Sequence, residues 1–164
     1  MQPRRLLLPL GLVCVALVAL TALVLVVGRG GHARDDAEEP TPREVLRAWD
    51  ERRAAAWAGA DVGALRALYV EDAAAGRRDV RMLRSYVARG LSVRGMSTQV
   101  LAFEVLEAGD DILEVRVTDR VVGAVAVRDD DETTLPVAAP QERRVTLQRQ
   151  DGRWLVASVA TLAE

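Results

Sequence analysis

Few kinds of side chain in this sequence could do chemistry. The only histidine is His32 and the only cysteine is Cys14, and all 22 basic residues are arginines. These counts exclude Schiff-base lysine chemistry, an intramolecular disulfide and a Cys/His zinc site, and they leave no Ser/His or Cys/His catalytic pair within a folded domain. Any reaction would therefore depend on carboxylates, arginines, tyrosines, tryptophans and hydroxyls.

The carboxylate of Asp119 is the most informative candidate. In a regular strand it lies on the same face as Val117 and Val121, because side chains alternate with period two. A carboxylate in an apolar concavity has a raised pKa, which suits a general acid or base. The structural alternative, which we favour, is that Asp119 pairs with an arginine of a helix, such as Arg84, or lies at a bulge facing solvent.

Five aromatic side chains are candidates to line a ligand pocket together with Asp119. They are Trp49, Trp57, Tyr69, Tyr86 and Phe103. The tyrosines could donate hydrogen bonds to an oxyanion, but their spacing also fits the core edge of amphipathic helices. Because only 4% of the chain is aromatic, the hydrophobic core needs the tryptophans, and core packing is the alternative for them.

The charged stretches do not match known binding patterns. The run Asp129 to Glu132 lacks the spacing and the glycine of a calcium loop, so we expect a solvated loop and no metal. From Asp35 onward the chain has 18 basic and 24 acidic residues, a net charge of −6. Such a domain repels phosphate backbones, so we expect no nucleic-acid partner, and no motif indicates a cofactor.

Helical signals fill the first half of residues 41 to 164. Thr41-Pro42-Arg43-Glu44 is a capping box with proline at the first helical position. The helix that it opens ends near Gly59 and has a broad apolar face formed by Val45, Leu46, Trp49, Ala56 and Trp57. Asp61 is the expected N-cap of a second helix with Val62, Leu65, Leu68 and Tyr69, and Asp79 that of a third with Val80, Leu83, Val87 and Leu91.

Period-two alternation predicts strands in the second half. The alternating apolar residues are Leu101, Phe103 and Val105, then Leu113, Val115, Val117 and Val121, and then Val145 and Leu147. Asp151-Gly152 predicts a tight hairpin before a last strand from Trp154 to Leu162. Helices followed by antiparallel strands predict an α+β fold, with about three helices on one face of a curved sheet.

Two of these segments resemble a known superfamily. Residues Asp61 to Ala73 resemble the signature of NTF2-like (SnoaL-like, cystatin-like cone) domains, and Val145 to Val156 is similar to their closing hairpin. The likeness covers Thr41 to Leu162 and implies a cone-shaped domain. The chain departs from the family between the second and third helices, where Ala73 to Arg78 leaves little room for a short strand pair.

The N-terminal segment is a candidate transmembrane helix. The uncharged run Leu6 to Val27 has 19 hydrophobic residues in 22 positions. As a helix it spans ~33 Å, enough to cross a hydrocarbon core of ~30 Å. A cleaved signal peptide is the alternative, but its apolar region is typically ~7 to 15 residues. We expect a cytoplasmic N-terminus at 1–5, a span at 6–27, a linker at 28–40 and an extracytoplasmic domain at 41–164 in the cell membrane.

Two functions from different classes follow. Among NTF2-like proteins, those with one N-terminal span resemble this architecture most, namely Mce-associated membrane proteins and VirB8-like components. That resemblance implies a non-catalytic assembly domain with a protein partner, and a homodimer is a further expectation. The alternative is a small-ligand binder, or a SnoaL-like isomerase or cyclase using Asp119. A cavity that exposes Asp119 would favour the alternative, whereas a concave face closed by apolar side chains would favour the assembly domain.

We predict that the chain stays uncleaved and that protease added to intact cells removes the domain after Arg34. The reason is that a long apolar run follows Arg4 and Arg5 and anchors the chain with its domain outside. Immunoblotting against the domain measures both points. A mature protein that begins near Arg34, or a domain protected from external protease, contradicts the prediction.

Overall fold

The computed structural model describes residues 39–162, so the candidate span at 6–27 and the linker up to residue 38 lie outside the described residues. Within 39–162, no helix is long and apolar enough to cross a bilayer. The helices are α2 (Pro42–Ala58), α3 (Val62–Arg66) and α4 (Ala74–Val87). The strands are β1 (Ser92–Arg94), β2 (Ser97–Ala108), β3 (Ile112–Val122), β4 (Val125–Arg128), β5 (Asp131–Thr134), β6 (Gln141–Gln150) and β7 (Arg153–Thr161).

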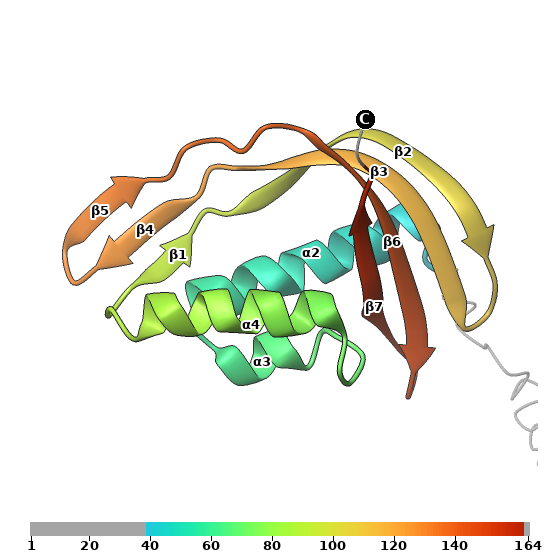
Figure 1. Cartoon of the computed structure of the whole chain (residues 1–164), viewed down its shortest axis with the longest axis horizontal. Coiled ribbons are helices and arrows are strands. Elements are labelled where there is room, and N and C mark those ends of the chain that lie inside the picture. The colour runs from blue at the N-terminus through green and yellow to red at the C-terminus, as the bar shows by residue number, and fades with distance from the viewer. Residues whose placement is uncertain (1–38, 163–164) are drawn as a thin grey trace, which may run out of the picture. The chain divides into compact units, whose positions relative to one another are not determined.

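The strands form two antiparallel sheets that curve over the helices, as Figure 1 shows. The larger sheet has the order β2-β3-β6-β7 and the smaller one the order β1-β4-β5. The α+β class, the curved antiparallel sheet and the helices on one face are therefore confirmed. The larger sheet and the helices enclose the core, whose fully buried side chains are Leu65, Leu83, Val115, Val117, Leu147 and Val156.

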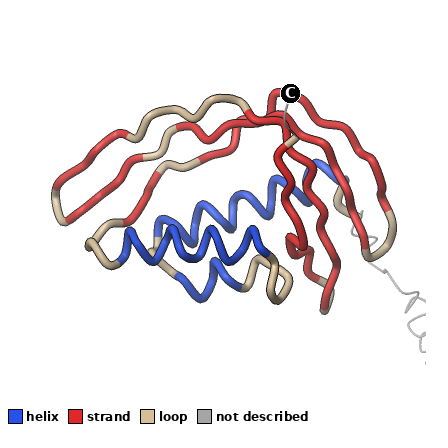
Figure 2. Tube along the Cα trace, in the orientation of Figure 1, coloured by secondary structure: helices blue, strands red, loops and turns tan. Residues whose placement is uncertain are grey.

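Two glycines interrupt the ladder where the larger sheet meets the smaller one. Gly95 separates β1 from β2, Gly123 separates β3 from β4, and the backbone continues across both junctions in Figure 2. Both have left-handed backbone angles, with φ of +67° and +70°. A Cβ on Gly95 would lie 2.6 Å from the Gly123 carbonyl oxygen, and one on Gly123 would lie 2.7 Å from that of Gly95. The strands bend at this junction between the two sheets, and the bend requires glycine on both strands because no side chain fits between the two carbonyls.

Local capping and turn signals predicted the starts of α2 and α3 and the hairpin correctly. The Thr41 hydroxyl accepts a hydrogen bond from the Glu44 amide, and the Glu44 carboxylate accepts one from the Thr41 amide, which completes the capping box. Asp61 accepts from the Ala64 amide at 2.8 Å and caps α3. Asp151 and Gly152 have positive φ angles, as a type I′ turn between β6 and β7 requires.

The prediction that Asp79 caps the third helix was wrong. Helix α4 begins at Ala74, five residues earlier, and Asp79 is buried inside it with its side chain bound to Arg53 and Tyr69. Gly76 is a residue of α4 that packs on Tyr69, where an added Cβ would lie 2.6 Å from the ring. Helix α3 is also shorter than predicted, because Tyr69 leaves the helix and forms an isolated bridge to Val156.

Strand β2 is more exposed than its alternation predicts. Its register against β3 shifts between Val100 and Ala102 and again between Val105 and Glu107, so Leu101 and Leu106 lie at bulges. Leu101 is 50% exposed as a result. The run Asp129 to Glu132, predicted to be a loop, contains the turn between β4 and β5 and the exposed start of β5.

We predict that Gly95→Ala and Gly123→Ala each lower the free energy of unfolding by ~2 to 4 kcal/mol. The left-handed angle costs ~1 to 2 kcal/mol for alanine, and displacing a carbonyl adds ~1 to 3 kcal/mol. Gly152→Ala is the matched control, because Gly152 has a φ of +72° but no atom within 4 Å of an added Cβ. Urea unfolding of residues 41–164 measures the three changes. Equal losses in all three variants would show that the close carbonyls do not constrain the bend.

Candidate functional site

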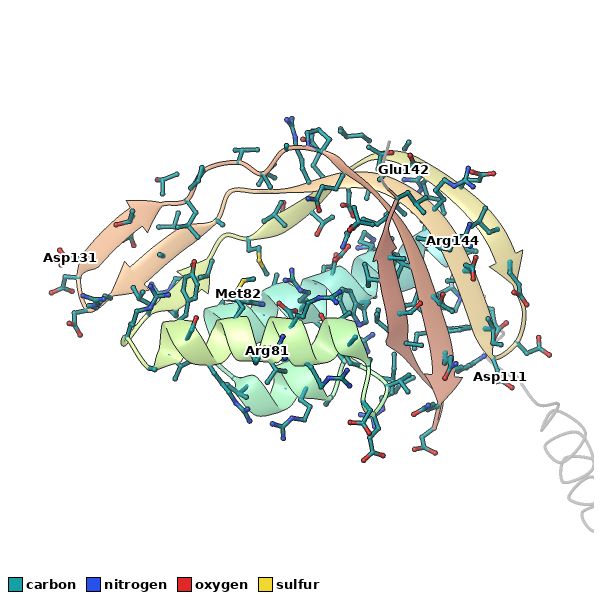
Figure 3. The ribbon with its side chains drawn as sticks, viewed as in Figure 1. Arg81, Met82, Asp111, Asp131, Glu142 and Arg144 are labelled. Carbon is teal, nitrogen blue, oxygen red and sulfur yellow. The ribbon has the colours of Figure 1, made fainter. Side chains whose placement is uncertain are left out.

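A cavity of about 370 Å³ lies between the helices and the larger sheet. Its polar lining includes side chains from both the helices and the sheet, among them Asp50 and Arg53 of α2, Tyr69, Asp79 of α4, Asp119 of β3 and Arg143 of β6. Met82 also lines it, and Figure 3 shows Met82 on the side of α4 that faces the sheet. The concave face is therefore hollow and is not closed by apolar side chains.

Asp119 is held in this cavity by an arginine of the neighbouring strand. The carboxylate is 4% exposed, and both of its oxygens accept hydrogen bonds from the Arg143 guanidinium, one of them at 3.0 Å from Nε. Arg143 pairs with Val117 in the register of β3 and β6, so it shares the concave face with Asp119 as a diagonal neighbour. The partner is thus Arg143 and not the helical Arg84, and its fork geometry occupies both carboxylate oxygens.

A second network joins α2, α4 and the segment after α3 at the floor of the cavity. Asp79 accepts hydrogen bonds from Arg53 Nε at 2.6 Å and Nη2 at 2.8 Å, and from the Tyr69 hydroxyl at 2.7 Å. Burial and the Asp79 charge raise the pKa of Tyr69 above its usual range. Burial alone would lower the pKa of Arg53, but its hydrogen bonds to Asp79 and the charge of that carboxylate raise it, so the guanidinium stays protonated.

Asp50 is the carboxylate of the cavity to which no arginine of residues 39–162 is bound. Burial raises the pKa of its carboxyl from 3.8 to about 6, and the charges of Arg143 and Arg53 only partly oppose this. Those arginines are committed to other carboxylates, and a Thr98 hydrogen bond is the remaining contribution that lowers the pKa of Asp50. Asp50 therefore exchanges a proton near neutral pH and can accept or donate a hydrogen bond.

An apolar compartment adjoins Asp50 on its other side. This hollow of about 470 Å³ lies between α2 and β2, and its apolar lining is Leu46, Ala54, Met96, Val100 and Phe103. Leu46, Asp50 and Thr98 line both hollows, so the polar cavity and the apolar compartment meet at Asp50. The Arg43 guanidinium lies 4.5 Å from the centroid of the Phe103 ring and covers one side of the compartment.

The candidate pocket residues predicted from the sequence are only partly brought together. Trp49, Tyr69 and Asp119 line the polar cavity, whereas Phe103 lies in the apolar compartment. Trp57 and Tyr86 do not reach either hollow. Their rings pack edge to face with centroids 5.4 Å apart, Trp57 buried in the core and Tyr86 half-buried against it.

Sequence reasoning missed the residues that define the site most sharply, namely Asp50, Arg53, Asp79 and Arg143. Helical spacing offered one signal, because Asp50 follows Leu46 by four residues and precedes Trp57 by seven. This places a carboxylate beside the apolar face of the helix. Arg143 had no comparable signal, since its partner depends on the register of two strands.

Comparisons with known proteins support the fold and no more. No protein-family model and no curated protein matches this sequence. An NTF2-like protein from Cytophaga hutchinsonii has a similar structure, with a TM-score of 0.51 at 16% identity over 76% of this chain and 100% of that one. The chain has an NTF2-like fold. Aln2 from a Streptomyces species is also similar, with a TM-score of 0.50 at 19% identity over 74% of this chain and 91% of that one.

We predict that Asp50→Asn makes the domain more stable than the wild type at pH 7. The folded pKa of about 6 lies above the ordinary 3.8, so ionised Asp50 opposes folding above pH 6, by up to ~3 kcal/mol. Because asparagine cannot ionise, its advantage should shrink as the pH falls through 6 and disappear below about 4.

Denaturant unfolding of residues 41–164 between pH 4 and 8, at about one-unit steps, measures this difference. Asp110→Asn is the matched control, because Asp110 is an exposed acid in the turn between β2 and β3. A variant at Asp50 that is less stable than the wild type at pH 7, or whose difference does not change with pH, contradicts the prediction.

Proposed function

We propose that this protein is a membrane-anchored module that binds a small amphipathic ligand in its cone-shaped pocket without converting it chemically. The two adjoining hollows support the proposal. Their volumes of about 370 and 470 Å³ fall within the ~300 to 1,000 Å³ typical of small-molecule sites. A ligand with an apolar body and one polar group matches an apolar compartment that opens onto a polar cavity.

The carboxyl of Asp50 is the single observation that carries this proposal. It lies where the two hollows meet, has a pKa of about 6 and forms no ion pair with another residue of 39–162. Asp50 is half-buried, and a carboxylate that is partly removed from water without a cationic partner is unfavourable in its charged form. A ligand that donates a hydrogen bond or carries an ammonium group would remove that penalty, so hydroxylated or amine-bearing apolar molecules are the preferred class.

A non-catalytic role agrees with the bonds that the other polar groups make. Asp119 and Asp79 are both bound by arginines, and the Tyr69 hydroxyl donates to Asp79. Catalysis by proton transfer usually needs a second acid or base within reach of the substrate. Asp50 has no such free partner among the cavity-lining residues described above.

Anchoring through Leu6 to Val27 completes the proposal. A tether of residues 28–40 would hold the pocket close to a bilayer, where amphipathic molecules concentrate. A protein partner and a homodimer stay predictions, and proteins that co-purify with the detergent-solubilised full-length chain would test the first.

The second candidate function is a SnoaL-like isomerase or cyclase. The pKa of about 6 favours it, because a general base works best when its pKa lies near the working pH. The base would then be Asp50 and not Asp119, whose carboxylate is occupied by Arg143.

We predict that hydroxylated or amine-bearing polycyclic compounds bind to residues 41–164 and that Phe103→Ala weakens this binding about tenfold or more. The reason is the loss of apolar contact in the compartment, worth ~1.5 to 3 kcal/mol for a fully buried phenylalanine. Leu101→Ala is the matched control, because Leu101 is an exposed apolar residue of β2 that does not line the compartment. Calorimetric titration measures the affinities.

Mass spectrometry of the recovered compound separates the two candidate functions. A ligand returned unchanged supports a binding module, whereas conversion by the wild type that is lost in Asp50→Asn supports the enzyme. Equal affinities of the Phe103→Ala and Leu101→Ala variants would contradict the assigned compartment.

A further inference from the structure

A third hollow, outside the proposed ligand pocket, lies along α3 and α4. Its volume is about 390 Å³, and its floor includes the Tyr69 ring, Gly76 and Val80. Four arginines line it, namely Arg66, Arg77, Arg81 and Arg84. We call it the arginine groove. Figure 3 shows Arg81 on α4, away from the side where Met82 faces the sheet.

The groove gathers positive charge on a domain whose overall charge is negative. Arg77, Arg81 and Arg84 follow the helical spacing of four and three residues, so they share one face of α4. Arg66 joins them from the end of α3. The one acid of α4 is Asp79, which is buried and bound by Arg53, so it does not neutralise this face.

Three of the four guanidinium groups are available to a ligand. Within residues 39–162, no hydrogen bond or ion pair involves the side chain of Arg66, Arg81 or Arg84. The fourth, Arg77, donates to the Asp72 carbonyl and lies 4.0 Å from its carboxylate. The acids of the lining are Glu71 and Asp72, so the groove keeps an excess of positive charge.

We propose that the arginine groove binds a phosphate-bearing group of a small molecule or lipid head group. Guanidinium groups present parallel N–H donors that match the oxygens of a phosphate, and several of them around one hollow surround such an anion. The volume suits a single head group, and the acids Glu71 and Asp72 can accept hydrogen bonds from hydroxyl or ammonium groups beside the phosphate. A long polyanion is disfavoured, because the net charge of −6 from Asp35 onward repels it.

Calorimetric titration of the full-length chain in a non-ionic detergent tests the proposal. The probes are pyrophosphate and glycerophosphoglycerol, the deacylated head group of a phosphodiester lipid. We expect saturable binding of both probes to the protein. Tighter binding of the diester indicates a lipid head group as the natural ligand, tighter binding of pyrophosphate indicates a soluble phosphate compound, and either result supports the groove.

The double variant Arg81→Gln/Arg84→Gln should weaken binding about tenfold or more, because each lost guanidinium removes charge-assisted hydrogen bonds. Arg94→Gln/Arg153→Gln is the matched control. It changes the net charge equally, and both residues are exposed and lie outside the groove. Its effect should stay below about threefold. Equal weakening in the two double variants, or no saturation with either probe, would overturn the proposal.

Discussion

The buried carboxylate of Asp79 fixes the relative positions of the three helices, and the cavity depends on it. Arg53 reaches it from α2 and the Tyr69 hydroxyl from the segment after α3, both across less than 3 Å. Removing one partner of such a pair typically costs ~3 to 5 kcal/mol, because a charge stays buried without compensation. Trp49 strengthens the same junction: its indole N–H donates to the Leu68 carbonyl at 2.8 Å, and its ring meets Tyr69 edge to face.

Features determined by neighbouring residues could be read from the sequence, and features determined by distant partners could not. The Thr41 capping box, the Asp61 cap and the Asp151-Gly152 turn each involve residues within a few positions of one another. Asp79 is a residue type that often caps helices, but its partner Arg53 lies 26 residues away in the sequence. Its burial depends on how the helices pack and could not be predicted from its neighbours. The two bulges of β2 likewise arise from its pairing with β3, so the alternation of residues in β2 alone did not predict that Leu101 is exposed.

The candidate site shows the same division. Asp119 was correctly placed on an inward face, because alternation along one strand is a local property. Its partner Arg143 depends on the register of β3 against β6, which alternation does not specify. The sequence places Asp50 one helical turn after Leu46, at the edge of the apolar face of α2. A carboxylate at such an edge is expected to face solvent, and only the covering by the sheet shows that it lines the cavity. Burial by a distant element is what gives this side chain its proton affinity.

The glycine pair at the sheet bend also limits how this sequence can change over generations. Each carbonyl oxygen lies within 2.7 Å of the position that a Cβ on the other residue would take, so the first substitution, at Gly95 or at Gly123, must push the two strands apart. Once they have separated, the second position faces a weaker steric barrier, and the double substitution costs less than the sum of the two single ones. The positions are therefore epistatic: relatives that bend the sheet in this way should keep both glycines or lose both together.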